Sequence, residues 1–327
     1  MRNQDRIEIN ELNKNANGGT ELITRRLFDL LEPEELDGIQ IITSRVRNLE
    51  PDALRIYHLH DLPNDTEASH LRYQESRDRF DRLVFCSNWQ YQEFQRELQL
   101  PFSRQHRVIE NGVDPIPLVP KTDPRTNPIR IIYTPTPHRG LELLVPAFEY
   151  LANMFDFIEL DVYSSFKLYG WEERDAQYQA LFERCKNHPR IRYHGTVDYE
   201  TIRKAYQDAH IFAYPSIWPE TSCRCLIEAM MAGCVCVHPN YAALYETSAG
   251  LTDWYNGDND PNVHLHEFIQ QMGVIIHNLR NTNVWDDPGF KAKQALVHTT
   301  ANVRFAWPNV IRKWKYLISE LKTEHDR

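Results

Sequence analysis

Residues 211–238 read IFAYPSIWPETSCRCLIEAMMAGCVCVH. An apolar run at 211–214 precedes a loop, residues 225–232 place apolar side chains at helical spacing, and a second apolar run follows at 235–238. This order predicts a strand, a helix and a strand, the unit that builds parallel sheets. We therefore expect an α/β fold with a doubly wound sheet.

The same alternation extends towards the N-terminus and then repeats. Residues 115–128, PIPLVPKTDPRTNP, interrupt it with five prolines and no periodicity, which is typical of a linker. The sequence thus predicts two Rossmann-like domains, at 1–120 and 121–300, with ligands bound at the carboxyl ends of the strands. Strands are expected at 6–9, 39–42, 54–59, 83–86, 107–110, 129–133, 158–163 and 191–194, and helices at 22–31, 89–98, 141–154, 201–209 and 305–321.

Composition excludes several classes of protein. With 42% hydrophobic and 25% charged residues among 327, the chain is expected to be globular rather than disordered. The net charge of −9 argues against nucleic acid or an anionic lipid surface as the main partner. No apolar run approaches the roughly 18 residues of a membrane-spanning helix, and the N-terminus does not resemble a signal peptide. A cytoplasmic protein without an integral membrane segment is expected.

Two carboxylates in the quoted segment suggest a binding site. Glu220 lies in the loop, Thr221 and Ser222 are expected to cap the helix, and Glu228 follows about two turns later. Such carboxylates can accept hydrogen bonds from vicinal hydroxyls, and the N–H groups of a helix start can bind an anion, as a nucleoside diphosphate sugar requires. Alternatively, Glu220 stabilises the helix dipole and Glu228 is a solvated residue. The apolar neighbours of Glu228 favour a functional role.

This segment resembles the donor-binding signature of retaining glycosyltransferases of family 4, which have the GT-B fold: a Glu, seven residues, Glu-Ala, a small residue and Gly. Further pieces resemble the family in order and spacing, over roughly residues 7 to 250. They are 17–21 (NGGTE), 86–89 (CSNW), 108–114 (VIENGVD), 134–142 (TPTPHRGLE) and 193–197 (YHGTV). The helix containing Trp307 resembles the family's closing helix, which implies that 301–327 packs back on the N-terminal domain.

The resemblance implies roles for individual residues. Glu220 would bind hydroxyls of the transferred sugar, Arg139 would stabilise the leaving diphosphate, and Glu228 would bind the ribose. His60, at the end of a strand, would contact the sugar, and Asp61 is a candidate on the acceptor side. Catalytic candidates are thus His60, Arg139 and Glu220, and donor-binding candidates are Gly18, Gly19, Thr134, Val197, Thr221, Ser222, Cys223 and Glu228. The alternating pattern places His58 on the same face as His60, and His58 is interpreted as a core histidine.

The sequence departs from the family where the first strand of the second domain ends. Tyr133-Thr134 replaces the usual Gly-Arg pair, which leaves Arg139 to act alone on the phosphates. The usual glycine-rich turn after the next strand reads Asp161 to Ser165, and the first domain is short. These departures keep a second interpretation open: a nucleotide-sugar-binding protein of the same fold that has weak transfer activity or none.

Two other classes are less favoured. Asn17-Gly18-Gly19 lacks the Gly-x-Gly-x-x-Gly spacing of nicotinamide-dependent enzymes. Zinc at the pairs Cys223/Cys225 and Cys234/Cys236 is disfavoured because structural zinc ligands are more widely spaced. The resemblance implies a retaining glycosyltransferase, and we expect it to use neither metal nor cofactor. Its donor would be a UDP- or GDP-linked sugar, and its acceptor a hydroxyl of an unknown glycan, lipid or protein.

Overall fold

The computed structural model describes residues 18–326, and the expected strand at 6–9 lies outside them. The chain forms two compact units. The first contains residues up to Asp114 together with the C-terminal segment from Arg304, and the second runs from Pro115 to Val303. The boundary at 114/115 lies a few residues before the expected one at 120.

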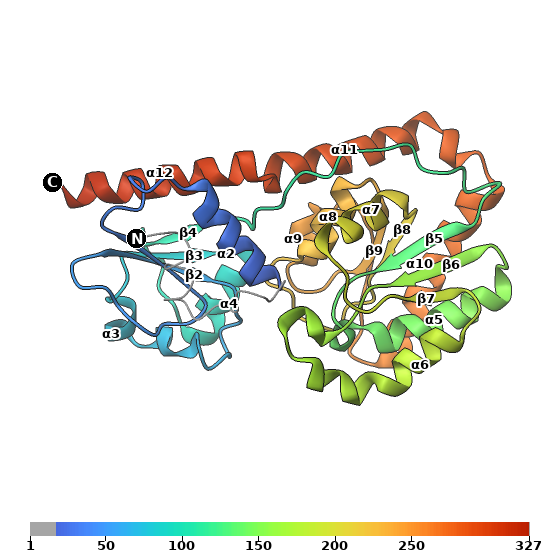
Figure 1. Cartoon of the computed structure of the whole chain (residues 1–327), viewed down its shortest axis with the longest axis horizontal. Coiled ribbons are helices and arrows are strands. Elements are labelled where there is room, and N and C mark those ends of the chain that lie inside the picture. The colour runs from blue at the N-terminus through green and yellow to red at the C-terminus, as the bar shows by residue number, and fades with distance from the viewer. Residues whose placement is uncertain (1–17, 327) are drawn as a thin grey trace. The chain divides into compact units, whose positions relative to one another are not determined.

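The first unit is a four-stranded parallel sheet between helices (Figure 1). Helices α2 and α12 pack on one face of the sheet, and α4 packs on the other, so that two hydrophobic clusters form. Each face buries the alternate side chains of the strands, as period-two patterning requires. The strands, in sheet order, are β1 (Ile39–Thr43), β2 (Leu54–Leu59), β3 (Arg82–Phe85) and β4 (His106–Val108), and the helices are α2 (Gly19–Leu30), α3 (Gln74–Arg77), α4 (Asn88–Leu98) and α12 (Trp307–His325).

Helix α12 is part of the first unit's core although it is last in the sequence. Trp307 and Trp314 are buried in the cluster that contains Leu27 of α2 and Val84 of β3. The backbone of Val113 pairs with that of Ala306 just before the helix begins. A side chain at Gly112 would overlap the Trp307 ring, so glycine is required there for the helix to dock.

The second unit is a six-stranded parallel sheet in the order β10-β9-β8-β5-β6-β7. Figure 1 shows α5 and α6 on one side of this sheet and α7 and α8 on the other. The strands are β5 (Ile129–Tyr133), β6 (Ile158–Val162), β7 (Ile191–Tyr193), β8 (Ile211–Ala213), β9 (Val235–Pro239) and β10 (Asp253–Tyr255). The helices are α5 (Leu141–Met154), α6 (Gln179–Asn187), α7 (Tyr199–Asp208), α8 (Arg224–Met231), α9 (Leu244–Ser248), α10 (Pro261–Asn281) and α11 (Pro288–Phe305).

The structure differs from the sequence-based expectation in several elements. Helix α2 begins at Gly19 rather than at 22, because Gly18 serves as its N-cap. Elements α6, α9, α10, α11 and β10 were not predicted. The expected linker has no regular structure but is held to the second unit, since the carbonyls of Pro115 and Pro117 accept hydrogen bonds from α7.

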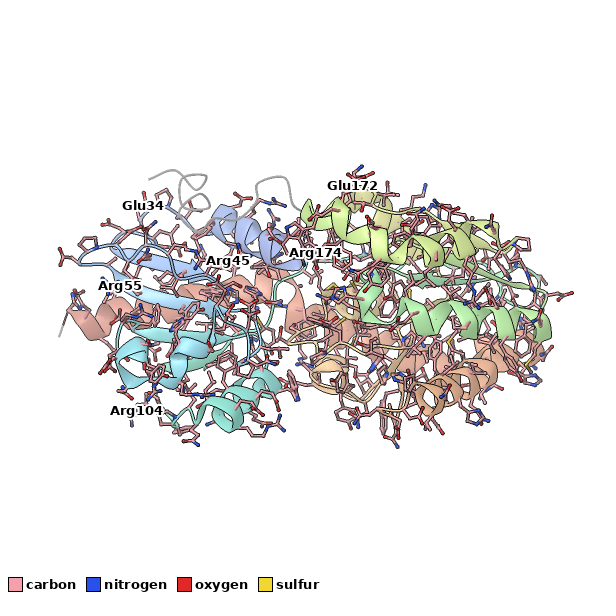
Figure 2. The ribbon with its side chains drawn as sticks, turned by 90° about the horizontal axis from the view of Figure 1, so that it is seen from below. Glu34, Arg45, Arg55, Arg104, Glu172 and Arg174 are labelled. Atoms are coloured by element: carbon pink, nitrogen blue, oxygen red, sulfur yellow. The ribbon has the colours of Figure 1, made fainter. Side chains whose placement is uncertain are left out.

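Charged side chains cover the outside of each unit. Figure 2 shows Glu34 and Arg104 on the first unit and Glu172 and Arg174 on the second, and all four are exposed. Among the residues that the structure describes, no helix is both long and apolar enough to cross a membrane.

Candidate functional site

The central feature of the second unit is an ion pair between Arg139 and Glu220. Arg139 ends the short 3₁₀ turn Pro137–Arg139 after β5, and Glu220 lies in the loop between β8 and α8. Nη1 of Arg139 donates to Oε1 of Glu220 at 2.6 Å. The sequence separates these residues by 81 positions, and the neighbouring strands β5 and β8 bring them together.

The surroundings of this pair are mostly buried. Glu220 is 6% exposed, and its Oε1 also accepts a hydrogen bond of 2.6 Å from the Tyr214 hydroxyl. Burial alone would lower the pKa of Arg139, but the Glu220 carboxylate more than offsets it and holds that pKa well above its usual value. Burial, and then the charge of Glu220, raise the pKa of Tyr214 well above its usual value. The site therefore holds a fixed cation, Arg139, and a carboxylate, Glu220, which accepts hydrogen bonds from Arg139 and Tyr214.

Gly140 allows the two loops to approach each other. It adopts a φ of +133°, and a Cβ atom there would overlap the carbonyl oxygen of Pro215. The same approach lets the Ile217 N–H donate to the Arg139 carbonyl at 3.2 Å. Only glycine can both adopt this φ and fit against the Pro215 carbonyl. Gly140 therefore fixes the position of Arg139 relative to the loop that carries Glu220.

The start of α8 differs from the prediction. The helix begins at Arg224, and its N-cap is Cys223 rather than Thr221 or Ser222. Within the described residues, no side chain caps this helix start through a hydrogen bond. Thr221 and Ser222 are half-buried in the preceding turn, between Glu220 and the helix. Because the first N–H groups of a helix have no intrahelical partner, they are suited to an anionic or oxygen-rich ligand.

Glu228 is buried, but it has a partner. Nε of Arg224 donates to Oε1 of Glu228 at 2.7 Å, one helical turn apart, and Glu228 is only 4% exposed. The Arg224 guanidinium also lies over the Tyr199 ring, 4.7 Å from its centroid. Burial opposes the charge of Arg224, but Glu228 raises its pKa above the usual value. Glu228 is thus not the solvated residue of the alternative interpretation, and Arg224 neutralises its buried charge.

Two further donor-site candidates lie in the same unit. The Thr134 hydroxyl, directly after β5, is hydrogen-bonded to the Tyr206 hydroxyl of α7 at 2.5 Å. Val197 is half-buried in the loop between β7 and α7. The polar group after β5 is therefore a neutral hydroxyl that is already paired within the unit.

In the first unit, Gly18 and Gly19 form the start of α2. Gly18 is the N-cap, and among the described residues no side chain caps the helix. A Cβ added to Gly19 would meet none of the described atoms within 4 Å. The described part of the fold therefore does not require glycine at 19.

His60 lies just beyond β2 and belongs to a cluster with His58 and Cys86. Nε2 of His60 is 3.2 Å from Nδ1 of His58, and its Nδ1 is 3.6 Å from the Cys86 sulfur. Burial lowers the pKa of His60 to about 4 and that of His58 well below its usual value. Both rings are therefore neutral at pH 7.

The other face of His58 agrees with its interpretation as a core residue. His58 is buried, and its ring contacts Trp314 of α12 edge-on, with the centroids 4.9 Å apart. Asp61, which follows His60, is half-buried, and burial raises the pKa of its carboxyl group.

His58, His60 and Cys86 also form a group of potential metal ligands, with ligand atoms within 4.8 Å of one another. However, each histidine directs one ring nitrogen to the other histidine and one to Cys86, and the Cys86 thiol donates to the Leu59 carbonyl at 3.1 Å. A metal ion at this cluster would have to break the hydrogen bond from the Cys86 thiol to Leu59 and remove the thiol proton. Cys223, Cys225, Cys234 and Cys236 are free thiols.

Some residues around the site were not singled out from the sequence. Tyr214 and Arg224 bind the two glutamates directly, and Trp218 and His138 lie beside Arg139. Arg224 has a signal in the sequence, since Arg and Glu four residues apart share a helix face. The contacts of Tyr214, Trp218 and His138 depend on the folded loops, which the spacing of the residues does not reveal.

Comparison with known families agrees with this geometry. Residues 124–248 match the model of the family described as Glycosyl transferases group 1. This segment includes Arg139, Glu220 and Glu228 and lies within the second unit. No curated protein matches the sequence at a significant level.

Solved structures share the fold. A glycosyltransferase from Rickettsia africae ESF-5 aligns with a TM-score of 0.64 at 17% identity, over 95% of this chain and 84% of that one. The pneumococcal O-GlcNAc transferase GtfA, solved with UDP and GlcNAc, gives 0.59 at 13% identity, over 92% and 60% of the two chains. HepE from Anabaena, solved with UDP and glucose, gives 0.57 at 18% identity, over 82% and 72%.

These alignments define the class of fold. The two parallel α/β units form a two-domain, Rossmann-like GT-B fold, and this prediction from the sequence is confirmed. The chain spans less than two thirds of the length of the pneumococcal protein.

Proposed function

We propose that this protein is a retaining glycosyltransferase of the family 4 type that moves a sugar from a nucleoside diphosphate to an acceptor hydroxyl. The observation that carries the proposal is the ion pair between the partly buried Arg139 and the buried Glu220. It lies just before a helix start that no described side chain caps, inside the segment that matches the family model. A cation, a carboxylate and backbone N–H groups at a helix start can together bind a sugar diphosphate.

In the proposed reaction, the bond from the sugar C1 to the donor phosphate oxygen breaks, and the acceptor oxygen bonds to C1 on the same face. The acceptor proton passes to the leaving phosphate oxygen, so that no covalent enzyme intermediate and no metal ion is needed. Arg139 stabilises the negative charge that develops on the diphosphate. Glu220 orients the sugar through its hydroxyls, and the backbone of residues 221–223 holds the sugar and the diphosphate.

The remaining candidates take supporting roles in this proposal. Glu228, oriented by Arg224, binds the ribose hydroxyls, and Thr134 and Val197 line the donor site. In the first unit, Gly18 and Gly19 let backbone approach the phosphates or the acceptor, His60 contacts the sugar, and Asp61 belongs to the acceptor side. The donor is UDP- or GDP-linked. UDP sugars are the first to test, because two similar structures contain UDP.

The proposal is tested by isothermal titration of the protein with UDP, GDP, UDP-glucose, UDP-N-acetylglucosamine and GDP-mannose. We expect one nucleoside diphosphate and its sugar to bind, Glu228→Gln to weaken both, and Glu220→Gln to abolish transfer while leaving nucleoside diphosphate binding. Glu267→Gln, an equal charge change on an exposed residue of α10, serves as the control. If neither UDP sugars nor GDP sugars bind the wild type, the proposal is wrong.

One observation favours a second candidate, a nucleotide-sugar-binding protein without transfer. The Thr134 hydroxyl, paired with Tyr206, stands where the family resemblance would place a second phosphate-binding cation. Such a protein would bind the donor but turn over neither donor nor acceptor. Donor hydrolysis, or transfer in a pooled acceptor screen, excludes this candidate.

A further inference from the structure

Trp218 is an exposed tryptophan next to the candidate sugar-binding carboxylate. It precedes Glu220 by two residues in the loop between β8 and α8, and it is 39% exposed. Ile217, its neighbour, is exposed to a similar extent. Large apolar side chains exposed beside a polar site often take part in ligand binding.

The backbone of Trp218 is held in place by three hydrogen bonds. Its N–H donates to the Ser216 hydroxyl oxygen at 3.2 Å, and its carbonyl accepts from that hydroxyl at 3.1 Å. The same carbonyl accepts from the Glu220 N–H at 2.9 Å. The indole therefore starts from a fixed backbone, and that backbone is tied directly to the residue that carries the carboxylate.

The indole ring also has packing partners. The His138 ring meets it edge-on, with centroids 4.7 Å apart, and the Arg139 guanidinium lies 5.7 Å from its centroid. His138 in turn stacks on the buried Phe166 at 5.1 Å. Burial, with a smaller effect of Arg139, lowers the pKa of His138 to about 4, so this ring is neutral at pH 7. Part of the indole is thus held by neighbours while part stays open to solvent.

An aromatic ring beside a carboxylate matches the two sides of a pyranose sugar. The C–H groups on one face of the ring are apolar and gain from contact with an indole, whereas the hydroxyls at its edge need charged acceptors. The fixed indole of Trp218 and the carboxylate of Glu220 offer both kinds of contact within two residues of one loop.

We propose that Trp218 is a stacking platform for the pyranose ring of the donor, and that it determines how tightly the sugar part binds. The inference rests on the proposed function, because it assumes that the donor carries a sugar next to Glu220. The inference adds Trp218 to the residues that contact the sugar. Because Trp218 contacts only the sugar part, it would strengthen binding of a nucleoside diphosphate sugar but not of the bare nucleoside diphosphate.

The experiment compares binding of UDP-glucose and UDP, and of GDP-mannose and GDP, by the wild type, Trp218→Ala and Trp218→Phe. We expect Trp218→Ala to raise the Kd of the nucleotide sugar about tenfold, or 1.4 kcal/mol, and to leave the Kd of the bare nucleotide within twofold. Trp218→Phe keeps an aromatic face and should lose less than threefold. The matched control is Trp254→Ala, which removes a tryptophan of similar exposure, 37%, on β10.

The outcomes separate this inference from the proposed function. Unchanged binding of the sugar nucleotide to Trp218→Ala, or an equal loss for sugar nucleotide and bare nucleotide, would overturn the platform. If the wild type binds no nucleotide sugar, the proposed function fails and the platform fails with it. Trp218→Phe retains an aromatic ring at this position. Circular dichroism of this variant shows whether it is folded.

Discussion

Oε1 of Glu220 accepts hydrogen bonds from both Nη1 of Arg139 and the hydroxyl of Tyr214, each at 2.6 Å. One carboxylate oxygen thus joins the turn after β5, the end of β8 and the loop before α8. The side chain of Glu220 is therefore needed for stability as well as for the proposed binding of the sugar.

Removal of this carboxylate should destabilise the protein. Glu220→Ala leaves the largely buried Arg139 without its counter-charge, which typically costs about 3–5 kcal/mol. Glu220→Gln retains an oxygen that can accept both hydrogen bonds, so we expect a loss of about 1–2 kcal/mol. Urea denaturation followed by circular dichroism measures both. Stability of both variants equal to that of the wild type would show that Glu220 has no structural role, and equal losses in the two would show that the retained amide oxygen does not replace the carboxylate.

Gly140 should tolerate alanine far less well than another glycine with a positive φ. Gly140→Ala overlaps the Pro215 carbonyl, whereas a Cβ added to Gly38, with a φ of +68°, would meet none of the described atoms within 4 Å. We expect Gly38→Ala to cost only about 1–2 kcal/mol of left-handed strain. Gly140→Ala should cost more and also weaken nucleotide binding, because it moves Arg139. Thermal unfolding and titration with UDP or GDP compare the two variants. Equal effects of Gly140→Ala and Gly38→Ala would show that the contact with Pro215 does not require glycine at 140.

Gly19→Ala separates stability from function. The added methyl group meets no described atom within 4 Å, and alanine is a better helix former than glycine at the start of α2. We therefore expect an unchanged or slightly higher melting temperature. If backbone at Gly19 contacts phosphate or acceptor, transfer should fall at least tenfold in the same variant. Unchanged activity would remove Gly19 from the site.

Helix α12 should be essential to the first unit. Trp314 is buried in a cluster with Ile23 of α2 and Ile41 of β1, so Trp314→Ala should cost about 3–5 kcal/mol. Tyr316→Ala on the same helix removes an exposed ring and should cost less than about 0.5 kcal/mol. Guanidinium denaturation compares the two variants, and equal losses would contradict the packing of α12 on this core.

Stability should fall as the solution becomes acidic. Burial lowers the pKa of His60, His106, His138 and His238 to about 4 in the folded protein, below the usual 6.5. The unfolded chain therefore binds more protons between these values, and stability is present above pH 6.5 and is lost as the pH falls towards 4. Each such group contributes up to about 1.4 kcal/mol per pH unit in this window.

The measurement is urea denaturation at pH 7.5, 6.0 and 5.0. His138→Phe replaces one of these rings with an apolar ring that does not titrate, so the pH dependence should become shallower. An unchanged slope would show that His138 is not protonated more readily in the unfolded chain.

Much of the fold could be predicted because its strands are short apolar runs between amphipathic segments. The helix at 141–154 was predicted with the bounds that the structure shows. The long helix α10 was missed although Phe268, Met272 and Leu279 recur at helical spacing. The strand β10 was missed because its three residues, Asp253–Tyr255, are too few to show alternation. The N-cap of α8 was misplaced because Ser and Thr usually cap helices, whereas here the chain enters the helix one residue later, at Cys223.

The site was only partly accessible from the sequence. The spacing of Glu220 and Glu228 is local and was visible, as was the position of Arg139. The direct bond from Arg139 to Glu220 depends on the pairing of β5 with β8 and could not be read from spacing. His60 was expected to be open to the sugar, but its ring nitrogens are directed to His58 and Cys86, an arrangement that needs the register of β2 and β3.

The first unit is built from two separate segments of the chain, and this affects the order of folding during synthesis. The second unit is built from one continuous stretch, Pro115 to Val303, so it can fold as soon as that stretch has left the ribosome. The first unit emerges earlier but lacks the face covered by α12 until Trp307 to Leu321 have been made. Meanwhile Leu27, Ile41 and Val84 of the nascent chain lack part of their apolar cover. Of the two units, the one whose translation begins earlier is therefore the one completed later.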